Sequence, residues 1–146
     1  MSGRTITAEL GEGASLPVSL EEVERAVASV LDAEGVAEAE LSVAFVSDAS
    51  IAELNERFLA HEGVTDVISF PLHLPGGAPL GDIYIGAEQA VRQAPGEVRE
   101  EILRLAVHGT LHVLGYEHPE GAERERSPMY LRQEELLAAF LAARGA

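Results

Sequence analysis

Three of the chain's five histidines stand within one run, HGTLHVLGYEH, at positions 108–118. His108 and His112 are four residues apart, and because an α-helix turns by about 400° over four residues, both rings leave the same helix face. Gly115 follows, and glycine enters left-handed backbone conformations without a steric penalty. We therefore expect a helix that ends near Gly115 and a turn that brings His118 back beside the first two rings.

Three imidazoles at this spacing predict a metal site. Two ring nitrogens one helical turn apart can reach one ion at about 2.0–2.1 Å, the usual Zn–N distance. Three protein ligands with a fourth position left open are typical of catalytic zinc, which lowers the pKa of a bound water. The sequence therefore predicts that His108, His112 and His118 bind one Zn²⁺ ion, and that the protein is a zinc-dependent hydrolase.

The same spacing, HxxxHxxGxxH, occurs in zinc endopeptidases of the metzincin type. Those enzymes carry a glutamate directly after the first histidine, where it activates water, but this chain has Gly109 there. Met129 lies downstream, as their methionine turn does, although a core methionine is the simpler interpretation. A peptidase-like zinc hydrolase is therefore an alternative that lacks its main catalytic group.

The run HGTLHVLGYEH also resembles the signature HGxLHLxGYDH of the bacterial YbeY family of rRNA-maturation endoribonucleases. A second block, LN at 54–55, TDVISFP at 65–71 and LGDI at 80–83, is similar to that family's LN, TDVLSFP and LGDI. The resemblance implies a single-strand-specific, metal-dependent endoribonuclease that acts in small-subunit (16S-type) rRNA 3′-end maturation and ribosome quality control. It also implies RNA, the small ribosomal subunit or its assembly proteins as partners.

Two positions depart from the family's pattern. The family usually has an arginine shortly after LN, in a stretch associated with RNA phosphates, and Leu59 stands there in this chain. Arg57 lies two residues earlier, which on a helix is a rotation of about 200°, to the far side. Glu117 replaces an aspartate before the third histidine, and its carboxylate is a candidate to orient a ligand or relay a proton. The catalytic groups therefore stay unassigned, and a non-catalytic ribosome-assembly factor with a structural zinc is a second alternative.

Four further residues are candidates for a place near the metal, whereas His61 is expected to be solvated. His61 and His73 lie in or beside loops, and His73 can approach a metal cleft from the Pro-Gly-rich segment. The resemblance implies that the strand with Asp66 and Ser69 borders this cleft, and Asp82 is a candidate outer partner of a histidine. For each of the four candidates, a solvated or otherwise hydrogen-bonded side chain is the competing interpretation.

The charge of the chain opposes indiscriminate RNA binding. The formal net charge is −15, and all ten basic residues are arginine. RNA-binding surfaces are normally positive, because phosphate contacts supply much of the affinity. Either a partner carries the positive charge, or the acidic residues lie away from the site and leave a local basic groove. The candidate arginines for such a groove are Arg57, Arg92, Arg99, Arg104, Arg124 and Arg126.

Length and composition predict a single domain, residues 1–146. There is no cysteine, which excludes disulfides and thiolate metal sites. We find no signal-peptide pattern and no apolar run long enough to cross a bilayer, so we expect a cytoplasmic protein without a membrane segment.

Hydrophobic periodicity predicts an α+β fold rather than a wound parallel sheet. Alternating apolar residues indicate strands over 4–10, 41–45, 66–70 and 81–85, and the Pro-Gly-rich segment 71–79 indicates a loop. Helices are expected after a capping box formed by Ser19 and Glu22, after Ser47 or Asp48, over 87–94, from Glu97 through the histidine run, and after Ser127-Pro128. The expectation is a sheet of about four strands packed with five or six helices, with the metal site on the long central helix and the following turn.

Overall fold

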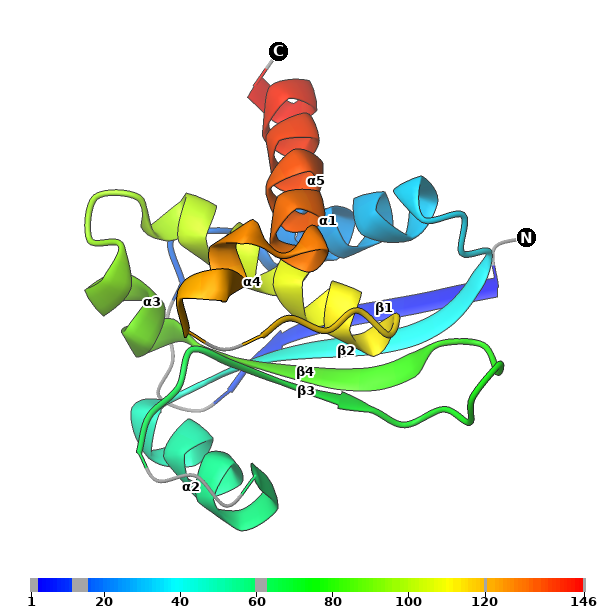
Figure 1. Ribbon diagram of the computed structural model, residues 1–146. Coiled ribbons are helices and arrows are strands. Elements are labelled where there is room, and N and C mark those ends of the chain that lie inside the picture. Colours follow the sequence, from blue (N-terminus) through cyan, green and yellow to red (C-terminus); the bar gives the residue numbers. More distant parts are fainter. Residues whose placement is uncertain (1–2, 12–15, 60–62, 120, 146) are drawn as a thin grey trace.

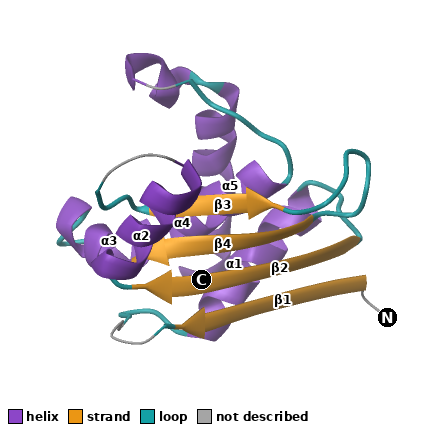
Figure 2. Cartoon of the chain, turned by 90° about the horizontal axis from the view of Figure 1, so that it is seen from below, coloured by secondary structure: helices purple, strands orange, loops and turns teal. Residues whose placement is uncertain are grey.

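The structure, a computed structural model, describes residues 3–11, 16–59, 63–119 and 121–145. Its centre is a four-stranded mixed sheet in the order β1-β2-β4-β3. The strands are β1 (Gly3–Leu10), β2 (Glu38–Val46), β3 (Val67–Pro71) and β4 (Leu80–Gly86). β1, β2 and β4 run parallel, and β3 runs antiparallel at the edge beside β4 (Figure 2). The four predicted strands are thereby confirmed.

Helices cover the two faces of the sheet unequally (Figure 1). The helices are α1 (Leu20–Ala33), α2 (Asp48–Leu59), α3 (Ala87–Gln93), α4 (Val98–Val113), the 3-10 helix η1 (Gly121–Arg126) and α5 (Pro128–Gly145). α1, α4 and α5 lie on one side of the sheet, whereas α2 lies on the other. The expected α+β fold is confirmed, although the sequence did not predict η1. Within the described residues, no helix is both long and apolar enough to cross a membrane.

Buried positions alternate along β2 and β4, as expected for strands with one covered face. The large residues on the helix side are Leu41, Val43, Phe45, Ile83 and Ile85, each at most 1% exposed. Asp82 and Tyr84 point to the opposite face, as the alternation predicts. The core therefore lies between the sheet and the α1–α4–α5 layer.

α4 lies unusually close to the sheet, and two glycines make this possible. A Cβ atom at Gly109 would stand 2.6 Å from Ile83 Cγ2, and one at Gly81 would stand 2.8 Å from Val113 Cγ2. Ser69 Oγ on β3 donates to the Gly109 carbonyl at 3.3 Å. The contacts seat the C-terminal half of α4, which carries two of the three histidines, against β3 and β4.

Serine side chains cap three helices where the sequence predicts it. Ser19, Ser47 and Ser127 each accept a first-turn backbone N–H, at 3.1, 3.3 and 3.2 Å. Glu22, the second member of the predicted capping box, is ion-paired with Arg99 of α4. That carboxylate therefore also ties α1 to α4.

Candidate metal centre

The last turn of α4 and the glycine after it bring the three histidines together. Gly115 has φ +104°, its N–H donates to the His112 carbonyl at 3.0 Å, and the N–H of Tyr116 donates to the Leu111 carbonyl at 3.0 Å. This pair of bonds is a Schellman motif, which ends a helix and reverses the chain direction. The turn carries His118 back beside the helix, as the sequence predicts.

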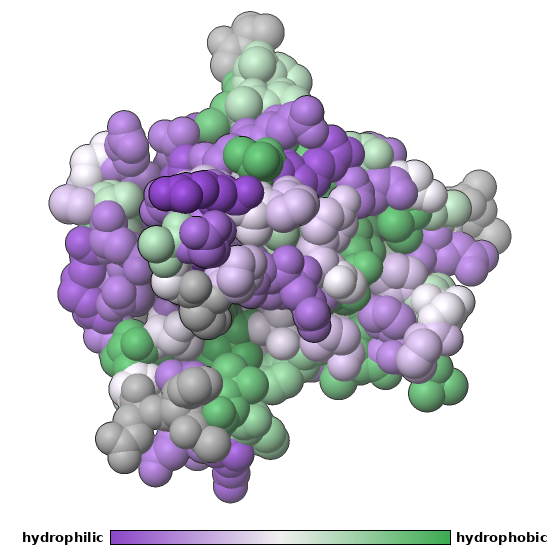
Figure 3. Space-filling view, viewed as in Figure 1, coloured by the Kyte–Doolittle hydropathy of each residue, from purple (hydrophilic) through white to green (hydrophobic). Residues whose placement is uncertain are grey.

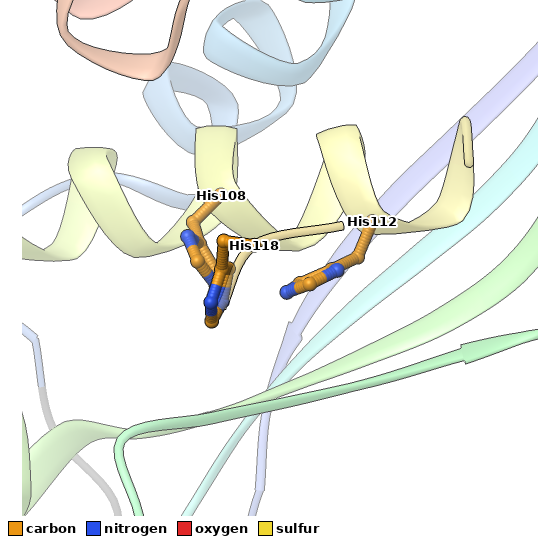
Figure 4. Close-up of side chains that lie close together, drawn as sticks. All are labelled: His108, His112 and His118. Carbon is orange, nitrogen blue, oxygen red and sulfur yellow. The ribbon is translucent and has the colours of Figure 1, made fainter. Parts of the chain in front are cut away.

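The three rings face one another on the sheet side of α4 (Figure 4). Their centroids are 4.6 Å apart for His108 and His112, 5.1 Å for His108 and His118, and 5.0 Å for His112 and His118. One ring nitrogen from each histidine lies within 4.8 Å of the other two. This separation suits three ligands of a single ion.

The other ring nitrogen of each histidine, Nδ1, forms a hydrogen bond with an oxygen acceptor. The acceptors of the Nδ1–H groups are Gln133 Oε1 for His108 (2.6 Å), the Tyr116 carbonyl for His112 (3.0 Å) and the Pro119 carbonyl for His118 (3.1 Å). Because these oxygens can only accept, Nδ1 carries the proton and Nε2 keeps its lone pair. Metal-bound histidines show this same arrangement. The donor set therefore fits a metal ion.

A chain of side chains from α5 and α4 orients His108. Gln133 is 3% exposed, and its Nε2 donates to Glu134 Oε2 at 3.0 Å, which leaves Oε1 to face the His108 ring. Glu134 in turn accepts from Arg104 at 2.9 and 3.1 Å. The sequence analysis did not identify Gln133 as a residue of the site. A signal was present, because this glutamine interrupts the buried stripe of α5 between Met129 and the following leucines.

Burial keeps the helical histidines neutral. Desolvation, together with the nearby charges of His112 and Arg124, lowers the pKa of His108 to about 4, against the opposing effect of the Gln133 hydrogen bond. Burial is also the largest cause that lowers the pKa of His112. At neutral pH both rings are therefore in the neutral form, which is the form that binds metal ions.

The histidines line a cavity of ≈1000 Å³. Its other walls come from the β3 region, which includes Asp66 and Ser69, from Glu117 in the turn, from Leu59 at the end of α2, and from Arg124 in η1. Figure 3 shows hydrophobic residues gathered on the lower part of this face, toward α2. The strand with Asp66 and Ser69 therefore borders the cleft, as the resemblance implies, and Glu117 lies on the wall of the same cavity.

Two other candidates lie elsewhere. His73 sits in the β3–β4 hairpin, where its Nδ1 accepts the backbone N–H of Leu80 at 3.1 Å. Asp82 lies on the opposite face of the sheet and accepts from Ser42 Oγ at 2.7 Å. Neither lines the cavity, so for both residues the competing interpretation holds, a hydrogen-bonded side chain away from the histidines. His61 lies outside the described residues.

The predicted groove of six arginines is wrong. Only Arg124 among them lines the cavity, because the others pair with carboxylates on the surface. The pairs are Arg57–Glu53, Arg92–Asp48, Arg99–Glu22, Arg104 with Glu101 and Glu134, and Arg126–Glu123. As the helix rotation predicts, Arg57 does not replace the family arginine beside the cleft, where Leu59 is 42% exposed.

The structure removes the support for a peptidase-like site. A side chain at position 109 would point at Ile83 of the sheet, at 2.6 Å, instead of toward the histidine nitrogens. Met129 is 1% exposed and packs in a cluster with Leu111 and Leu136, so it is a core residue. Neither the glutamate nor the methionine of a metzincin has a counterpart here.

Comparison with known proteins places this site in a family. The family model described as "Endoribonuclease YbeY" matches residues 12–141. A relative of that name from Pelotomaculum thermopropionicum is 44% identical over 125 residues, 77% of this chain and 80% of its own. Another from Beutenbergia cavernae is 41% identical over 144 residues, 88% of this chain and 94% of its own. The solution structure of TM1509 from Thermotoga maritima matches 95% of this chain and 91% of its own, with 26% identity and a TM-score of 0.64. The chain therefore belongs to the YbeY endoribonuclease family.

Proposed function

We propose that the protein is a metal-dependent endoribonuclease that cuts single-stranded RNA during maturation of the small-subunit rRNA 3′ end and in ribosome quality control, in the cytoplasm. The observation that carries the proposal is the convergence of three histidine nitrogens on the wall of a ≈1000 Å³ cavity, in a chain of this family. That volume is at the upper end of ligand pockets, so a segment of an extended strand has room to enter.

His108, His112 and His118 would hold one ion through Nε2. Three neutral imidazoles without a thiolate suit Zn²⁺, and three protein ligands leave a further position open, as in catalytic zinc sites. When bound, the ion would supply Lewis-acid chemistry, by polarising a phosphate oxygen and stabilising the charge that develops during cleavage.

The chain itself would orient the ligands and handle protons. The three Nδ1–H contacts fix the rings so that Nε2 faces the cavity. Glu117, directly before His118, places a carboxylate on the same wall. It is our candidate to accept a proton from the attacking hydroxyl group.

A non-catalytic assembly factor is the second candidate, and a specific observation favours it. The net charge is −15, and Arg124 is the only arginine among the described residues that lines the ≈1000 Å³ cavity. In that case the ion would be structural, and a ribosomal partner would carry the positive charge.

The test is cleavage of a single-stranded RNA that ends like the small-subunit rRNA 3′ tail. Zinc-loaded protein should cut it, and His112→Ala, prepared identically, should neither cut it nor retain stoichiometric zinc. His73→Ala is the matched control, because it removes a histidine outside the cavity, and it should still cut. If both the wild type and His112→Ala fail to cut, the result favours the non-catalytic assembly-factor role. Equal cutting by both would indicate a contaminating nuclease and contradict the proposed site.

A further inference from the structure

Among the arginines whose side chains the structure describes, Arg124 alone lacks a carboxylate partner within those residues. Among the arginines whose side chains the structure describes, eight form an ion pair: Arg4, Arg25, Arg57, Arg92, Arg99, Arg104, Arg126 and Arg132. The guanidinium of Arg124 forms none within the same residues. In a chain with 25 acidic residues, a half-buried cation without an anionic partner calls for an explanation.

The position of Arg124 supplies an explanation for its missing anionic partner. It stands in η1 and lines the cavity together with the three histidines. It also lines a smaller adjoining cavity of ≈260 Å³, which borders His108 on the side of Gln133 and Tyr130. The side chain therefore reaches the histidines from the helix side of the sheet, whereas Leu59 reaches the same cavity from α2, on the other side (Figure 1).

This guanidinium forms no hydrogen bond or ion pair within the described residues. The backbone of Arg124 is held by Ser127, whose Oγ and N–H donate to the Arg124 carbonyl at 2.6 and 3.2 Å. These bonds fix η1 at the start of α5 through the Arg124 carbonyl and the hydroxyl and N–H groups of Ser127, without the guanidinium group. The side chain is thus positioned by the turn and has its donors available to a ligand.

We propose that Arg124 binds a phosphate of the RNA strand in the metal cleft, and that it is the residue that provides substrate affinity there. The inference rests on the proposed nuclease function and names a substrate-binding residue for it. A cation beside a metal site is repelled by the ion unless an anion lies between them. A phosphodiester carries one negative charge and two non-bridging oxygens, which match the planar fork of an arginine.

Arg126 offers a matched control. It is two residues further along η1 and carries the same charge, but its side chain is 77% exposed, pairs with Glu123 at 3.8 Å, and does not line the cavity. Arg124→Gln and Arg126→Gln change the net charge equally. Any difference between them therefore reports the position of Arg124 and not the total charge of the protein.

The experiment measures binding of a fluorescent single-stranded RNA by anisotropy at several salt concentrations, with metal-free protein so that no cleavage occurs. Arg124→Gln should bind about tenfold more weakly, as for loss of one charge-assisted contact. The slope of log K against log salt should become shallower by about 0.7, the value for one phosphate of a single strand. Arg126→Gln should stay within about twofold of the wild type, because exposed charges are screened. Arg124→Lys should keep the slope and lose part of the affinity.

The outcomes separate this inference from the proposed function. If zinc-loaded wild type cuts the RNA and Arg124→Gln binds it with the wild-type affinity and slope, the role of Arg124 is refuted and the nuclease stands. If Arg124→Gln and Arg126→Gln weaken binding equally, the effect is general charge, and the inference is again refuted. A wild type that neither binds nor cuts single-stranded RNA overturns both. Thermal unfolding of each variant checks folding, and Arg124→Lys gives the same test should the glutamine variant unfold.

Discussion

Replacing Gln133 with leucine tests whether a residue outside the ligand set controls the metal site. Leucine has a similar volume, so it preserves the packing of α5, but it cannot accept the Nδ1–H of His108. In the wild type this bond is 2.6 Å long and joins two side chains that are 3% and 5% exposed. Gln133→Leu therefore removes this hydrogen bond from a nearly dry environment, together with the one that Gln133 Nε2 donates to Glu134.

The size of the effect follows from that burial. A buried donor left without an acceptor costs about 1–3 kcal/mol. In the metal-free variant, His108 can avoid this cost by moving its proton to Nε2 or by rotating its ring, and metal binding has to reverse the change. Outer partners of ligand histidines are worth about 10–100-fold in metal affinity, or about 1.4–2.7 kcal/mol. We expect Gln133→Leu to bind zinc more weakly by a factor in this range.

Competition with a chromophoric zinc chelator measures the affinity, and ¹⁵N NMR of the histidine rings in metal-free protein measures the tautomer. The wild type should show the Nδ1–H form of His108 at neutral pH. Gln133→Glu is the comparison variant, because it keeps an acceptor for Nδ1–H, and its carboxyl group in the protonated form can still donate to Glu134 Oε2 as the amide does at 3.0 Å. It should therefore keep more of the zinc affinity than Gln133→Leu. Unchanged zinc affinity in a folded Gln133→Leu protein would refute the positioning role.

Three further predictions concern the fold around the site. Gly109→Ala should lower the free energy of unfolding by about 1–2 kcal/mol, because the clash with Ile83 at 2.6 Å outweighs the gain in helix propensity. Urea denaturation should show a smaller loss when Gly109→Ala is made in an Ile83→Ala background. An equal loss in both backgrounds would contradict the clash. In metal-free protein, the folded state resists protonation of His108 down to its pKa of about 4, whereas the unfolded chain takes up the proton near 6.5. The contribution of the neutral His108 ring to the free energy of unfolding should therefore be fully present above pH 6.5, and about 3 kcal/mol of it should be lost as the pH drops toward 4. A free energy of unfolding that stays constant over this pH range would argue against a buried neutral ring. Gly115→Ala should cost about 1–2 kcal/mol at φ +104° and weaken zinc binding by displacing His118, with Gly115→Asn milder in both calorimetry and zinc competition.

Part of the site is local, and the sequence alone was enough to predict it. The four-residue spacing of His108 and His112 and the glycine at 115 need only helical geometry and one left-handed residue. The serine caps at 19, 47 and 127 and the alternation along β2 and β4 are equally local, because they depend on backbone periodicity within a few residues. The family resemblance likewise rested on short runs, HGTLHVLGYEH at 108–118 and the block at 54–83.

The rest depended on contacts between distant residues. Gln133 meets His108 across 25 positions of the chain, and Gly109 is required because Ile83 of another element lies beneath it. The sequence offered six arginines for a groove, and Arg124 is the one that lines the cavity. The other five pair with carboxylates: Arg92, Arg99 and Arg104 pair with residues of other elements, and Arg57 and Arg126 pair within their own helix. The sequence by itself determined which residues share a helix face or a turn, since that follows from backbone geometry. Only the tertiary structure decided which side chains meet, because charge pairing and close packing are settled between elements that the chain order does not place side by side.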